Sequence, residues 1–483
     1  MTASEQNLSM LMDLYELTMA NGYFGEKTGG ETVTFDVFYR RNPDGGGFAV
    51  FAGLEQVLDY LENLHFGEDD ISYLRSLGLF SEAFLTWLAG FRFRGSVTAL
   101  PEGTIMYPNE PVLTVNAPLI DAQLIETAIL NQINHQSLIA TKAQRIVRAA
   151  QGRAVFDFGA RRAHNAAAAL YGARAAYIGG VAGTATVMAG EAFGIPVTGT
   201  MAHSWVMAHG DEFTAFRQYA ERYPGNTVLL VDTYNVLGSG VPNAIRTARE
   251  VLEPMGARLK GIRLDSGDLA YLSKEARRML DQAGLTDVKI MASNGLDEFT
   301  IRSILDQGAA IDIFAVGERL ITAKSDAVFG GVYKLVAVQT GKACLPKIKV
   351  SETFEKITNP GRKRLWRVYD REGHSVADLI TLAEETPDFS RPYRYVDPEK
   401  PWKRLSFDNH TVRELHETVM TGGRRVSPSP TLEEIRSRVT RQLAAEVWPE
   451  EQRFENPHRH FLDMSPAYYE MKMNLLRETG FED

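Results

Sequence analysis

Eight short runs rich in apolar and β-branched residues recur between residues 154 and 338 of the 483-residue chain. Most are separated by stretches with helical spacing of apolar residues, which is the pattern of repeated strand–helix units. Eight such units suggest a closed parallel (β/α) barrel, so the sequence predicts an α/β fold of this kind. A doubly wound open sheet is the alternative. The runs cover residues 154–158, 175–179, 196–199, 227–232, 259–264, 288–293, 312–316 and 332–338.

Polar and small residues follow seven successive runs. The carboxyl ends of parallel strands meet at one face of a barrel, and barrel enzymes build their sites from the loops there. We therefore expect a single ligand site on this face. The strand-end segments are Asp157-Phe158-Gly159-Ala160-Arg161-Arg162, Gly179-Gly180-Val181-Ala182-Gly183-Thr184, Gly199-Thr200 with His203, Asp232-Thr233-Tyr234, Arg263-Leu264-Asp265-Ser266-Gly267-Asp268, Ser293-Asn294-Gly295 and Val316-Gly317-Glu318-Arg319.

One histidine, His203, follows an apolar run and a turn of small residues. At a strand end an imidazole can act as acid, base, nucleophile or ligand. The alternative is a histidine that only bonds a neighbouring carbonyl group. The charged residues at the other strand ends favour the functional interpretation.

Four arginines bring positive charge to the predicted face. Ser293-Asn294-Gly295 precedes a helical pattern, so we expect Asn294 to cap that helix and the helix start to bind an anion. Later strand loops are also where barrel enzymes usually bind phosphate, which predicts a phosphorylated ligand. The arginines are Arg161, Arg162, Arg263 and Arg319.

Carboxylates and an aromatic ring complete the predicted site. Asp232, Asp265 and Asp268 offer the hard oxygen ligands that Mg²⁺ prefers, which fits a di- or triphosphate. Capping of the following helix is the alternative role for these residues. The Phe158 ring, near Arg161, can stack on a planar heterocycle, although a core position would suit it equally well.

Charge and composition argue against several other classes of protein. The formal net charge is −9, from 52 basic and 61 acidic residues, so broad nucleic-acid binding is not expected. A single cysteine excludes an intrachain disulfide and disfavours a cysteine zinc site. The amino terminus contains acidic residues, and no run of about 18 apolar residues occurs, so neither a signal peptide nor a membrane span is expected. We expect a cytoplasmic enzyme.

The segments on either side of the repeated units predict further elements. A helix at 13–19 carries Tyr15, a candidate ligand-facing aromatic, and Asp121 is expected to cap a helix that reaches residue 151. The division we expect is an amino-terminal α+β domain at 1–118, a catalytic barrel at 119–340 and a carboxyl-terminal extension at 341–483 that packs back on the first domain. Other expected elements are strands at 32–40 and 365–369 and helices at 53–64, 431–447 and 465–476.

Several strings of residues resemble the nicotinate phosphoribosyltransferase family, in order, from near residue 9 to the carboxyl terminus. The resemblance implies an irregular α/β barrel with an added domain, and a homodimer. It also implies that nicotinate and phosphoribosyl pyrophosphate are joined to give nicotinate mononucleotide and pyrophosphate, coupled to ATP hydrolysis through a phosphorylated histidine. The strings are Asp13-Leu14-Tyr15-Glu16-Leu17-Thr18-Met19, Tyr39-Arg40-Arg41-Asn42-Pro43, Phe156-Asp157-Phe158-Gly159-Ala160-Arg161-Arg162-Ala163-His164, Gly199-Thr200-Met201-Ala202-His203, Leu264-Asp265-Ser266-Gly267-Asp268 and Phe329-Gly330-Gly331-Val332-Tyr333-Lys334-Leu335.

By this resemblance each predicted site residue receives a role. His203 is the phosphorylated histidine, and Asp265 is the second catalytic residue, near the ribose. Nicotinate is expected to contact Thr200 and Arg263 and to lie between Phe158 and a partner subunit's residue that matches Tyr15. Asp232 and Asp265 are the expected Mg²⁺ ligands. Phosphoribosyl pyrophosphate is expected to contact Arg161, Asp232, Ser266, Gly295, Gly317 and Glu318.

Two positions bear on specificity. The family often has threonine where Glu318 stands, so only the backbone N–H of Glu318 should serve a phosphate. Relatives that use nicotinamide carry an aspartate where this chain has Ala185, and an aspartate would repel a carboxylate substrate. The alternatives are a nicotinamide phosphoribosyltransferase and a non-catalytic barrel that binds phosphorylated ligands. A lysine Schiff-base enzyme is disfavoured, because Lys334 in the eighth run is the one candidate lysine.

Overall fold

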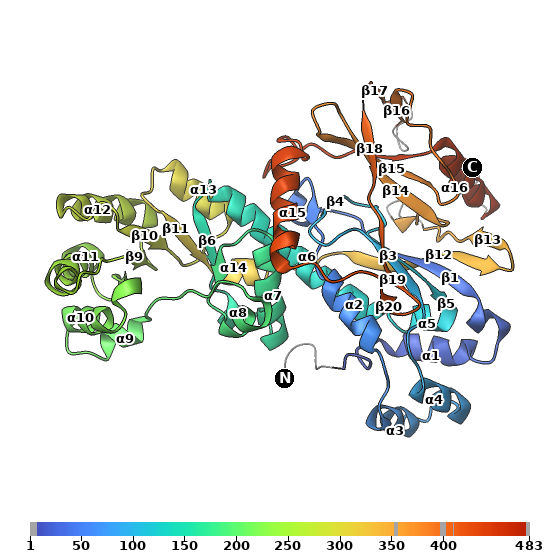
Figure 1. The fold of residues 1–483 in the computed structure, drawn as a ribbon, viewed down its shortest axis with the longest axis horizontal. Helices are drawn as coiled ribbons and strands as arrows, with labels where there is room; N and C mark the ends of the chain where they lie inside the picture. Colours follow the sequence, from blue (N-terminus) through green and yellow to red (C-terminus); the bar gives the residue numbers. More distant parts are fainter. Residues whose placement is uncertain (1–6, 352–355, 397–401, 409, 480–483) are drawn as a thin grey trace. The chain divides into compact units, whose positions relative to one another are not determined.

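The computed structural model describes residues 7–351, 356–396, 402–408 and 410–479. The chain forms two compact units, Met1–Leu138 with Val328–Asp483, and Ile139–Ala327 (Figure 1). Helix α6 (Glu126–Ala149) contains the first junction. The three-part division at 118 and 340 stays a prediction about domains.

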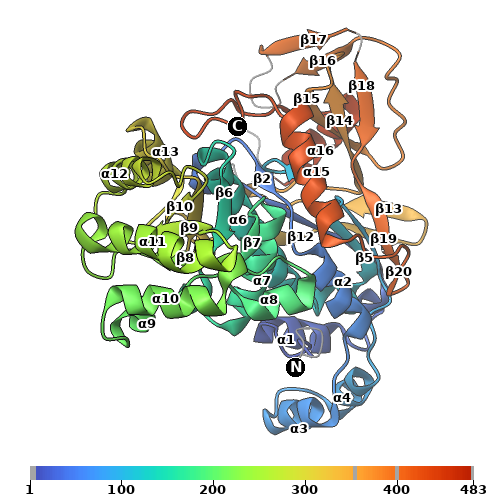
Figure 2. The ribbon, with the colours of Figure 1, turned by 60° about the vertical axis from the view of Figure 1, so that its left-hand side comes forward.

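The second unit contains a six-stranded parallel sheet with short, largely buried strands. The strand order is β7-β6-β11-β10-β9-β8, and each neighbouring pair is parallel. Helix α12 packs against β9 and β10 (Figure 2). The strands are β6 (Ala154–Asp157), β7 (Gly183–Thr184), β8 (Val228–Leu230), β9 (Gly261–Leu264), β10 (Lys289–Ala292) and β11 (Ile313–Val316). The helices include α7 (Ala166–Ile178), α8 (Val187–Phe193), α9 (His203–Met207), α10 (Glu212–Arg222), α11 (Val241–Thr247), α12 (Leu269–Gln282), α13 (Glu298–Asp306) and α14 (Glu318–Ile321).

The expectation of a closed barrel is wrong, because β7 and β8 are the two edges of an open sheet in the described part of this unit. The run at 175–179 lies in and just after the carboxyl end of α7, whose alanine-rich sequence favours a helix. The run at 196–199 contributes one bridge, between Val197 and Thr184. The eighth run lies in β12 (Gly331–Thr340), which belongs to the first unit.

The first unit combines both ends of the chain in one antiparallel sheet. Its strand order is β13-β12-β1-β5-β3-β19-β20. Residues of β1 face β12 on one side and β5 on the other, so the amino-terminal strand is central and almost fully buried. Besides β12, the strands are β1 (Thr32–Tyr39), β3 (Ser96–Ala99), β5 (Leu113–Pro118), β13 (Ala343–Pro346), β19 (Glu417–Thr421) and β20 (Arg424–Arg425).

A second sheet of the first unit has the order β18-β14-β15-β21, with β21 parallel to β15. Apolar residues of this region, including Val368, Ala377 and Leu379, form a buried cluster. The strands are β14 (Lys363–Tyr369), β15 (Ser375–Leu382), β18 (Thr411–Glu414) and β21 (Leu462–Met464). Two antiparallel strand pairs complete the strands, β2 (Ala49–Val50) with β4 (Ile105–Met106) and β16 (Tyr393–Val396) with β17 (Arg404–Phe407).

The helices predicted in the first unit are present, and polar side chains cap the starts of the two nearest the carboxyl terminus. Thr431 and Glu434 form a capping box at α15, and Ser465 caps α16. The helices are α1 (Leu14–Tyr23), α2 (Leu54–Asn63), α3 (Glu68–Ser76), α4 (Glu82–Ala89), α5 (Leu119–Gln123), α15 (Leu432–Ala445) and α16 (Pro466–Glu478). No helix in the described ranges is both long and apolar enough to cross a membrane.

The predicted capping role of Asp121 is wrong. Two helices, α5 and α6, replace the single helix expected from residue 121 to 151, and Asp121 lies inside α5. Its buried carboxylate instead forms an ion pair with Arg94, at 2.8 Å. A buried carboxylate requires such a partner, and the sequence gives no sign that residue 94 supplies it.

Candidate active site

Arg263, the third residue of β9, organises a polar cluster at the carboxyl ends of the parallel strands. Its side chain is 10% exposed, so its charge needs partners. Nε donates to the Ser293 hydroxyl at 2.9 Å, and Nη1 donates to the Thr200 hydroxyl at 3.0 Å. Nη2 forms an ion pair with Asp265 Oδ1, also at 3.0 Å. Three different strand-end segments therefore hold one guanidinium.

Asp265 follows β9 and is a strongly hydrogen-bonded carboxylate. Burial would raise its pKa, but the Ser293 hydroxyl and the Arg263 guanidinium hold the pKa of Asp265 below the usual value. The backbone N–H of Asp265 donates to Asp232 Oδ2 at 3.2 Å. The Ser266 hydroxyl donates to the same oxygen at 2.5 Å. Asp232 Oδ1 is buried and has no hydrogen-bond partner in the described structure.

His203 is the first residue of α9 and faces this cluster. Its Nδ1 lies 3.1 Å from the Thr233 hydroxyl oxygen, and its Nε2 lies 3.7 Å from Asp265 Oδ2. The imidazole side chain is 39% exposed, so a ligand can reach it. Its closest polar neighbours are thus a hydroxyl and a carboxylate, which disfavours the alternative of a histidine that serves only a backbone carbonyl.

Phe158 extends the cluster with an aromatic face. The Arg263 guanidinium carbon lies 5.4 Å from the centre of the half-buried ring, within cation–π range. Directly before it, Asp157 is fully buried and accepts from the Gly159 N–H at 2.9 Å and the Thr184 hydroxyl at 2.7 Å. Burial raises the pKa of Asp157. This carboxylate therefore joins the segment after β6 to the end of β7.

The loop after β10 differs in detail from the expectation. Asp297, and not Asn294, caps α13, by accepting from the Thr300 N–H at 2.8 Å. Asn294 instead has a positive φ of 84°, and Gly295 follows with a φ of 61°. Asp297 also forms an ion pair with Arg319, so part of the charge of that arginine is already neutralised. A single acidic residue thus orders both the loop and a predicted phosphate-binding arginine.

The segment after β11 approaches the segment after β6. The Phe158 N–H donates to the Val316 carbonyl at 2.8 Å. A Cβ on Gly317 would lie 3.2 Å from the Phe158 carbonyl oxygen, so a larger residue would be crowded. The Glu318 side chain forms an ion pair with Lys324 at 2.7 Å, which keeps its carboxylate occupied.

The predicted residues fall into three groups. The hydrogen bonds and short contacts described above connect Thr200, His203, Asp232, Arg263, Asp265 and Ser266, with Phe158 beside them. Arg161 is exposed at the end of the neighbouring β6 segment, whereas Gly295, Gly317 and Glu318 lie after β10 and β11; no described contact joins these four to the Arg263 guanidinium. Tyr15 belongs to the first unit, where it is 43% exposed on α1.

Two residues of the cluster were not singled out in the sequence, and one assigned candidate has another role. Ser293 and Thr233 both stand in strand-end segments, which was the available signal, but a small hydroxyl residue there does not reveal its partner. Asp268 accepts from the Tyr271 N–H at 3.0 Å and caps α12, so the alternative interpretation fits this residue.

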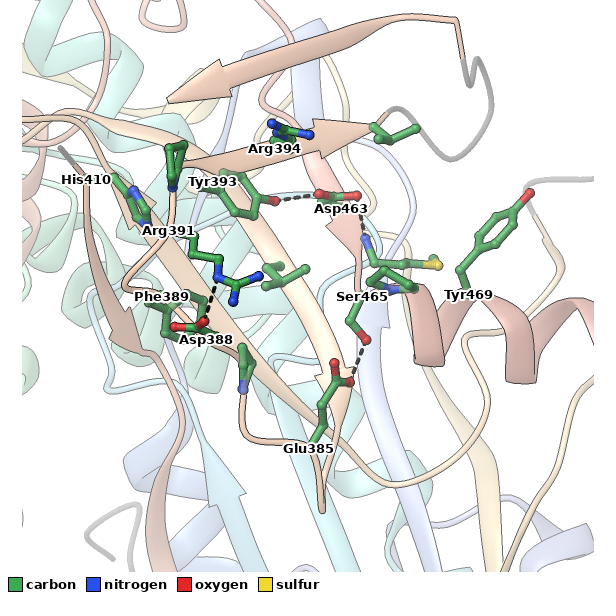
Figure 3. Close-up of a pocket in the computed structure, with 16 residues that line it drawn as sticks. Glu385, Asp388, Phe389, Arg391, Tyr393, Arg394, His410, Asp463, Ser465 and Tyr469 are labelled. Atoms are coloured by element: carbon green, nitrogen blue, oxygen red, sulfur yellow. Dashed lines mark hydrogen bonds and ion pairs between the residues drawn. The ribbon is translucent and has the colours of Figure 1, made fainter. Parts of the chain in front are cut away.

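A separate pocket of about 780 Å³ lies in the first unit, between β15, β16 and the start of α16 (Figure 3). Its lining includes Glu385, Arg391, Tyr393 and Asp463, and the Tyr393 hydroxyl donates to Asp463 at 2.6 Å. None of the predicted site residues lines it. The predicted site residues other than Tyr15 all belong to the second unit.

Three family descriptions match successive parts of the chain. Residues 10–134 match the nicotinate phosphoribosyltransferase (NAPRTase) N-terminal domain. Residues 154–346 match the nicotinate phosphoribosyltransferase (NAPRTase) family, and residues 362–472 match the nicotinate phosphoribosyltransferase C-terminal domain.

Individual relatives agree with these matches over nearly the whole chain. The nicotinate phosphoribosyltransferase of Bacillus subtilis strain 168 is 43% identical over 478 residues, covering 98% of this chain and 96% of that protein. The nicotinate phosphoribosyltransferase of Caenorhabditis elegans is 33% identical and covers 95% of this chain and 92% of its own length.

Solved structures show the same similarity in three dimensions. The human nicotinic acid phosphoribosyltransferase superposes with a TM-score of 0.86 at 29% identity, covering 96% of this chain and all of that chain. A nicotinate-nucleotide pyrophosphorylase from Pyrococcus furiosus gives a TM-score of 0.71 at 27% identity, covering 92% of this chain and 97% of that one.

Proposed function

Because this chain belongs to the nicotinate phosphoribosyltransferase family, we propose that it transfers phosphoribosyl from phosphoribosyl pyrophosphate to nicotinate. The products are nicotinate mononucleotide and pyrophosphate, and the reaction serves NAD biosynthesis. The observation that carries this proposal is the Arg263 guanidinium, held at a strand end beside the Phe158 ring and the Asp265 carboxylate. A cation next to an aromatic face suits an aromatic acid.

The proposed reaction is a displacement at the anomeric carbon. The nicotinate ring nitrogen forms a bond to this carbon while the bond from the carbon to pyrophosphate breaks. The electron pair of the broken bond leaves with pyrophosphate. Positive charge develops on the ribose in an oxocarbenium-like transition state. Asp265 is ionised, because its pKa is lowered, and its negative charge can stabilise that positive charge.

Mg²⁺ is the metal that we propose for the leaving group. Asp232 and Asp265 would hold it, and the buried, unpartnered Asp232 Oδ1 is an oxygen of the kind that this ion prefers. When bound, Mg²⁺ would neutralise charge on pyrophosphate. Asp232 Oδ2 is already fixed by the Asp265 N–H and the Ser266 hydroxyl, which leaves Oδ1 as its available oxygen.

Selection of the acid over the amide is assigned to Arg263 and to the absence of a carboxylate at Ala185. The Ala185 N–H donates to the Asp157 carbonyl oxygen at 2.8 Å, so this loop is held by its backbone. A nicotinamide-using enzyme remains the alternative function. Ala185 disfavours it, because an acceptor for the amide N–H groups would be missing there.

Replacing Arg263 by alanine is expected to raise the KM for nicotinate roughly 100-fold, because charge-assisted hydrogen bonds to the substrate carboxylate are lost. Arg258→Ala is the matched control, since Arg258 is in the same unit and forms an exposed ion pair with Asp287. Steady-state assays with varied nicotinate measure kcat and the KM for nicotinate in each variant. An unchanged nicotinate dependence in the Arg263 variant would remove this residue from the substrate site.

We also propose that ATP drives the reaction through phosphorylation of His203. The γ-phosphoryl group would pass to an imidazole nitrogen with release of ADP, and hydrolysis would later release phosphate. A phosphoryl group adds a charge of about −1.5 to −2 next to Asp265 and Arg263, which gives ATP a physical means to reorganise the site.

His203→Ala should therefore retain weak transfer that ATP no longer stimulates. The control is His209→Ala, because His209 lies at the end of the same segment but bonds the Trp205 carbonyl oxygen and Gln218. Product formation is measured with and without ATP for each variant. Full ATP stimulation in the His203 variant would show that another group accepts the phosphoryl.

A homodimer with a shared active site is the assembly that we propose. Two exposed apolar patches support it. On α1 and just before it, Leu11, Leu14, Tyr15 and Met19 are 38–50% exposed. On the second unit, near the Ala185 loop, Val187, Met188 and Val197 are 51–71% exposed. Burial of such patches between copies would remove apolar surface from water and could bring Tyr15 to the partner's Phe158.

A cytoplasmic location stays a prediction from the sequence.

A further inference from the structure

Ser293, the residue after β10, lies between the two side chains that define the proposed site. It is 2% exposed. Its hydroxyl oxygen accepts from Arg263 Nε at 2.9 Å, and the same hydroxyl forms a short hydrogen bond with Asp265 Oδ1. No role for Ser293 follows from the resemblance of the chain to its family.

The direction of both hydrogen bonds is fixed by the chemistry of the partners. A guanidinium only donates and an ionised carboxylate only accepts. The single proton of the Ser293 hydroxyl must therefore point to Asp265, while a lone pair of its oxygen faces Arg263 Nε. The Leu264 carbonyl oxygen, at 3.4 Å, is the weaker competing acceptor for that proton.

These contacts decide which part of Arg263 is left for a substrate. Ser293 and Asp265 occupy the side edge of the guanidinium, formed by Nε and Nη2. Thr200 takes one N–H of Nη1. A carboxylate that approaches Arg263 must then use the remaining N–H groups of Nη1 and Nη2, at the end of the side chain.

We propose that Ser293 is a positioning residue for the acid substrate, which locks the side edge of Arg263 to Asp265 and turns the free end of the guanidinium to the nicotinate carboxylate. This inference rests on the proposed function. Ser293 would then affect the preference for nicotinate without contacting nicotinate itself. Without the hydroxyl, Nε would lose its acceptor and the guanidinium could rotate or offer its side edge instead.

The hydroxyl is separable from the strand that carries it. The Ser293 backbone N–H donates to the Leu264 carbonyl at 2.9 Å, and β10 pairs with β9 through its own backbone. Ser293→Ala leaves these bonds in place. A purely structural hydroxyl would therefore affect the melting temperature and not the dependence on nicotinate.

Ser293→Ala is expected to raise the KM for nicotinate about 10-fold, with a smaller fall in kcat, and to narrow the preference for nicotinate over nicotinamide. Ser293→Thr retains a hydroxyl and should recover most of the nicotinate affinity. Ser293→Cys keeps the size of the side chain but is a weak donor, so it should be intermediate and covers the case of an unstable alanine variant.

Ser273→Ala is the matched control, because Ser273 is a buried serine of the same unit, and among the described residues its hydroxyl bonds the Ala270 carbonyl and the Ala310 N–H. It should leave the KM for nicotinate unchanged. The positioning role would be overturned if the wild type is active and the alanine and cysteine variants of Ser293 have the same KM for nicotinate as the wild type. A wild type without transfer to nicotinate would contradict the proposed function itself, which separates the two results.

Discussion

Replacing Asp265 by asparagine is expected to lower kcat by about 10²- to 10³-fold, which is the usual cost of losing a group that stabilises transition-state charge. Asparagine has nearly the same shape and can still accept from Arg263 and Ser293, but it carries no charge. The positive charge that develops on the ribose would then lack its anionic partner. Because the interaction is strongest in the transition state, kcat should fall more than nicotinate binding does.

Steady-state kinetics with saturating phosphoribosyl pyrophosphate and varied nicotinate test this expectation. Asp268→Asn is the control, since Asp268 is exposed three residues later and caps α12, a role that asparagine also performs. The control should keep nearly full activity. If kcat of the Asp265 variant stayed within about 10-fold of the wild type, an electrostatic role of that size would have to be assigned elsewhere.

Replacing Arg367 by methionine should destabilise the first unit by about 3–5 kcal/mol, the usual cost of removing one partner of a buried ion pair. Arg367 on β14 is 1% exposed and forms two hydrogen bonds with Asp378, at 2.8 and 2.7 Å. Glu110 Oε1 lies 3.8 Å away, and His460 Nε2 lies 3.5 Å from Asp378 Oδ1. Without the guanidinium, two buried acidic groups would lose the cation that lies near both, and Asp378 would keep the His460 imidazole beside it.

The pKa shifts in this cluster also show that the buried acidic groups depend on the charge of Arg367. Burial opposes ionisation of Asp378, but the charge of Arg367 lowers its pKa, with help from His460. Burial and the nearby Asp378 carboxylate raise the pKa of Glu110. The cluster is therefore held together by cationic groups inside an apolar region, and the loss of the strongest one cannot be compensated by water.

Urea unfolding followed by circular dichroism and tryptophan fluorescence measures the change. Arg364→Met is the matched control on the same strand, because the ion pair of Arg364 with Glu414 is about one-third exposed and should contribute less than about 1 kcal/mol. Equal losses of unfolding free energy in the two variants would show that burial of the ion pair does not decide how much stability is lost. A stable Arg367 variant would indicate that this region can repack around Asp378.

Most elements and the location of the polar cluster follow from local sequence patterns. The strands at 154–157, 261–264, 289–292 and 313–316 coincide with predicted apolar runs, because a short buried strand needs an almost continuous apolar sequence. The helices predicted at 431–447 and 465–476 are present as α15 and α16, and Thr431 and Ser465 cap their starts. Arg263 and Asp265 were found because charged residues at the end of a buried strand have few structural uses, and His203 because it follows an apolar run and a turn of small residues.

Pairing between distant segments was not encoded locally. The run at 332–338 has the composition of a barrel strand, but it belongs to the first unit, where it pairs antiparallel with β1. Asp297 caps α13 in place of Asn294, which has a positive φ, and the alanine-rich run at 175–179 continues a helix.

The parallel strand–helix repeats, the family and the charged residues at the strand ends could be predicted, because they depend on the order and local periodicity of residues. The open sheet, the link of Ser293 to Arg263 and Asp265, and the ion pair of Arg367 with a buried acid could not. Each of these depends on side chains or strand edges that lie far apart in the chain. Such segments interact only after folding brings them into contact.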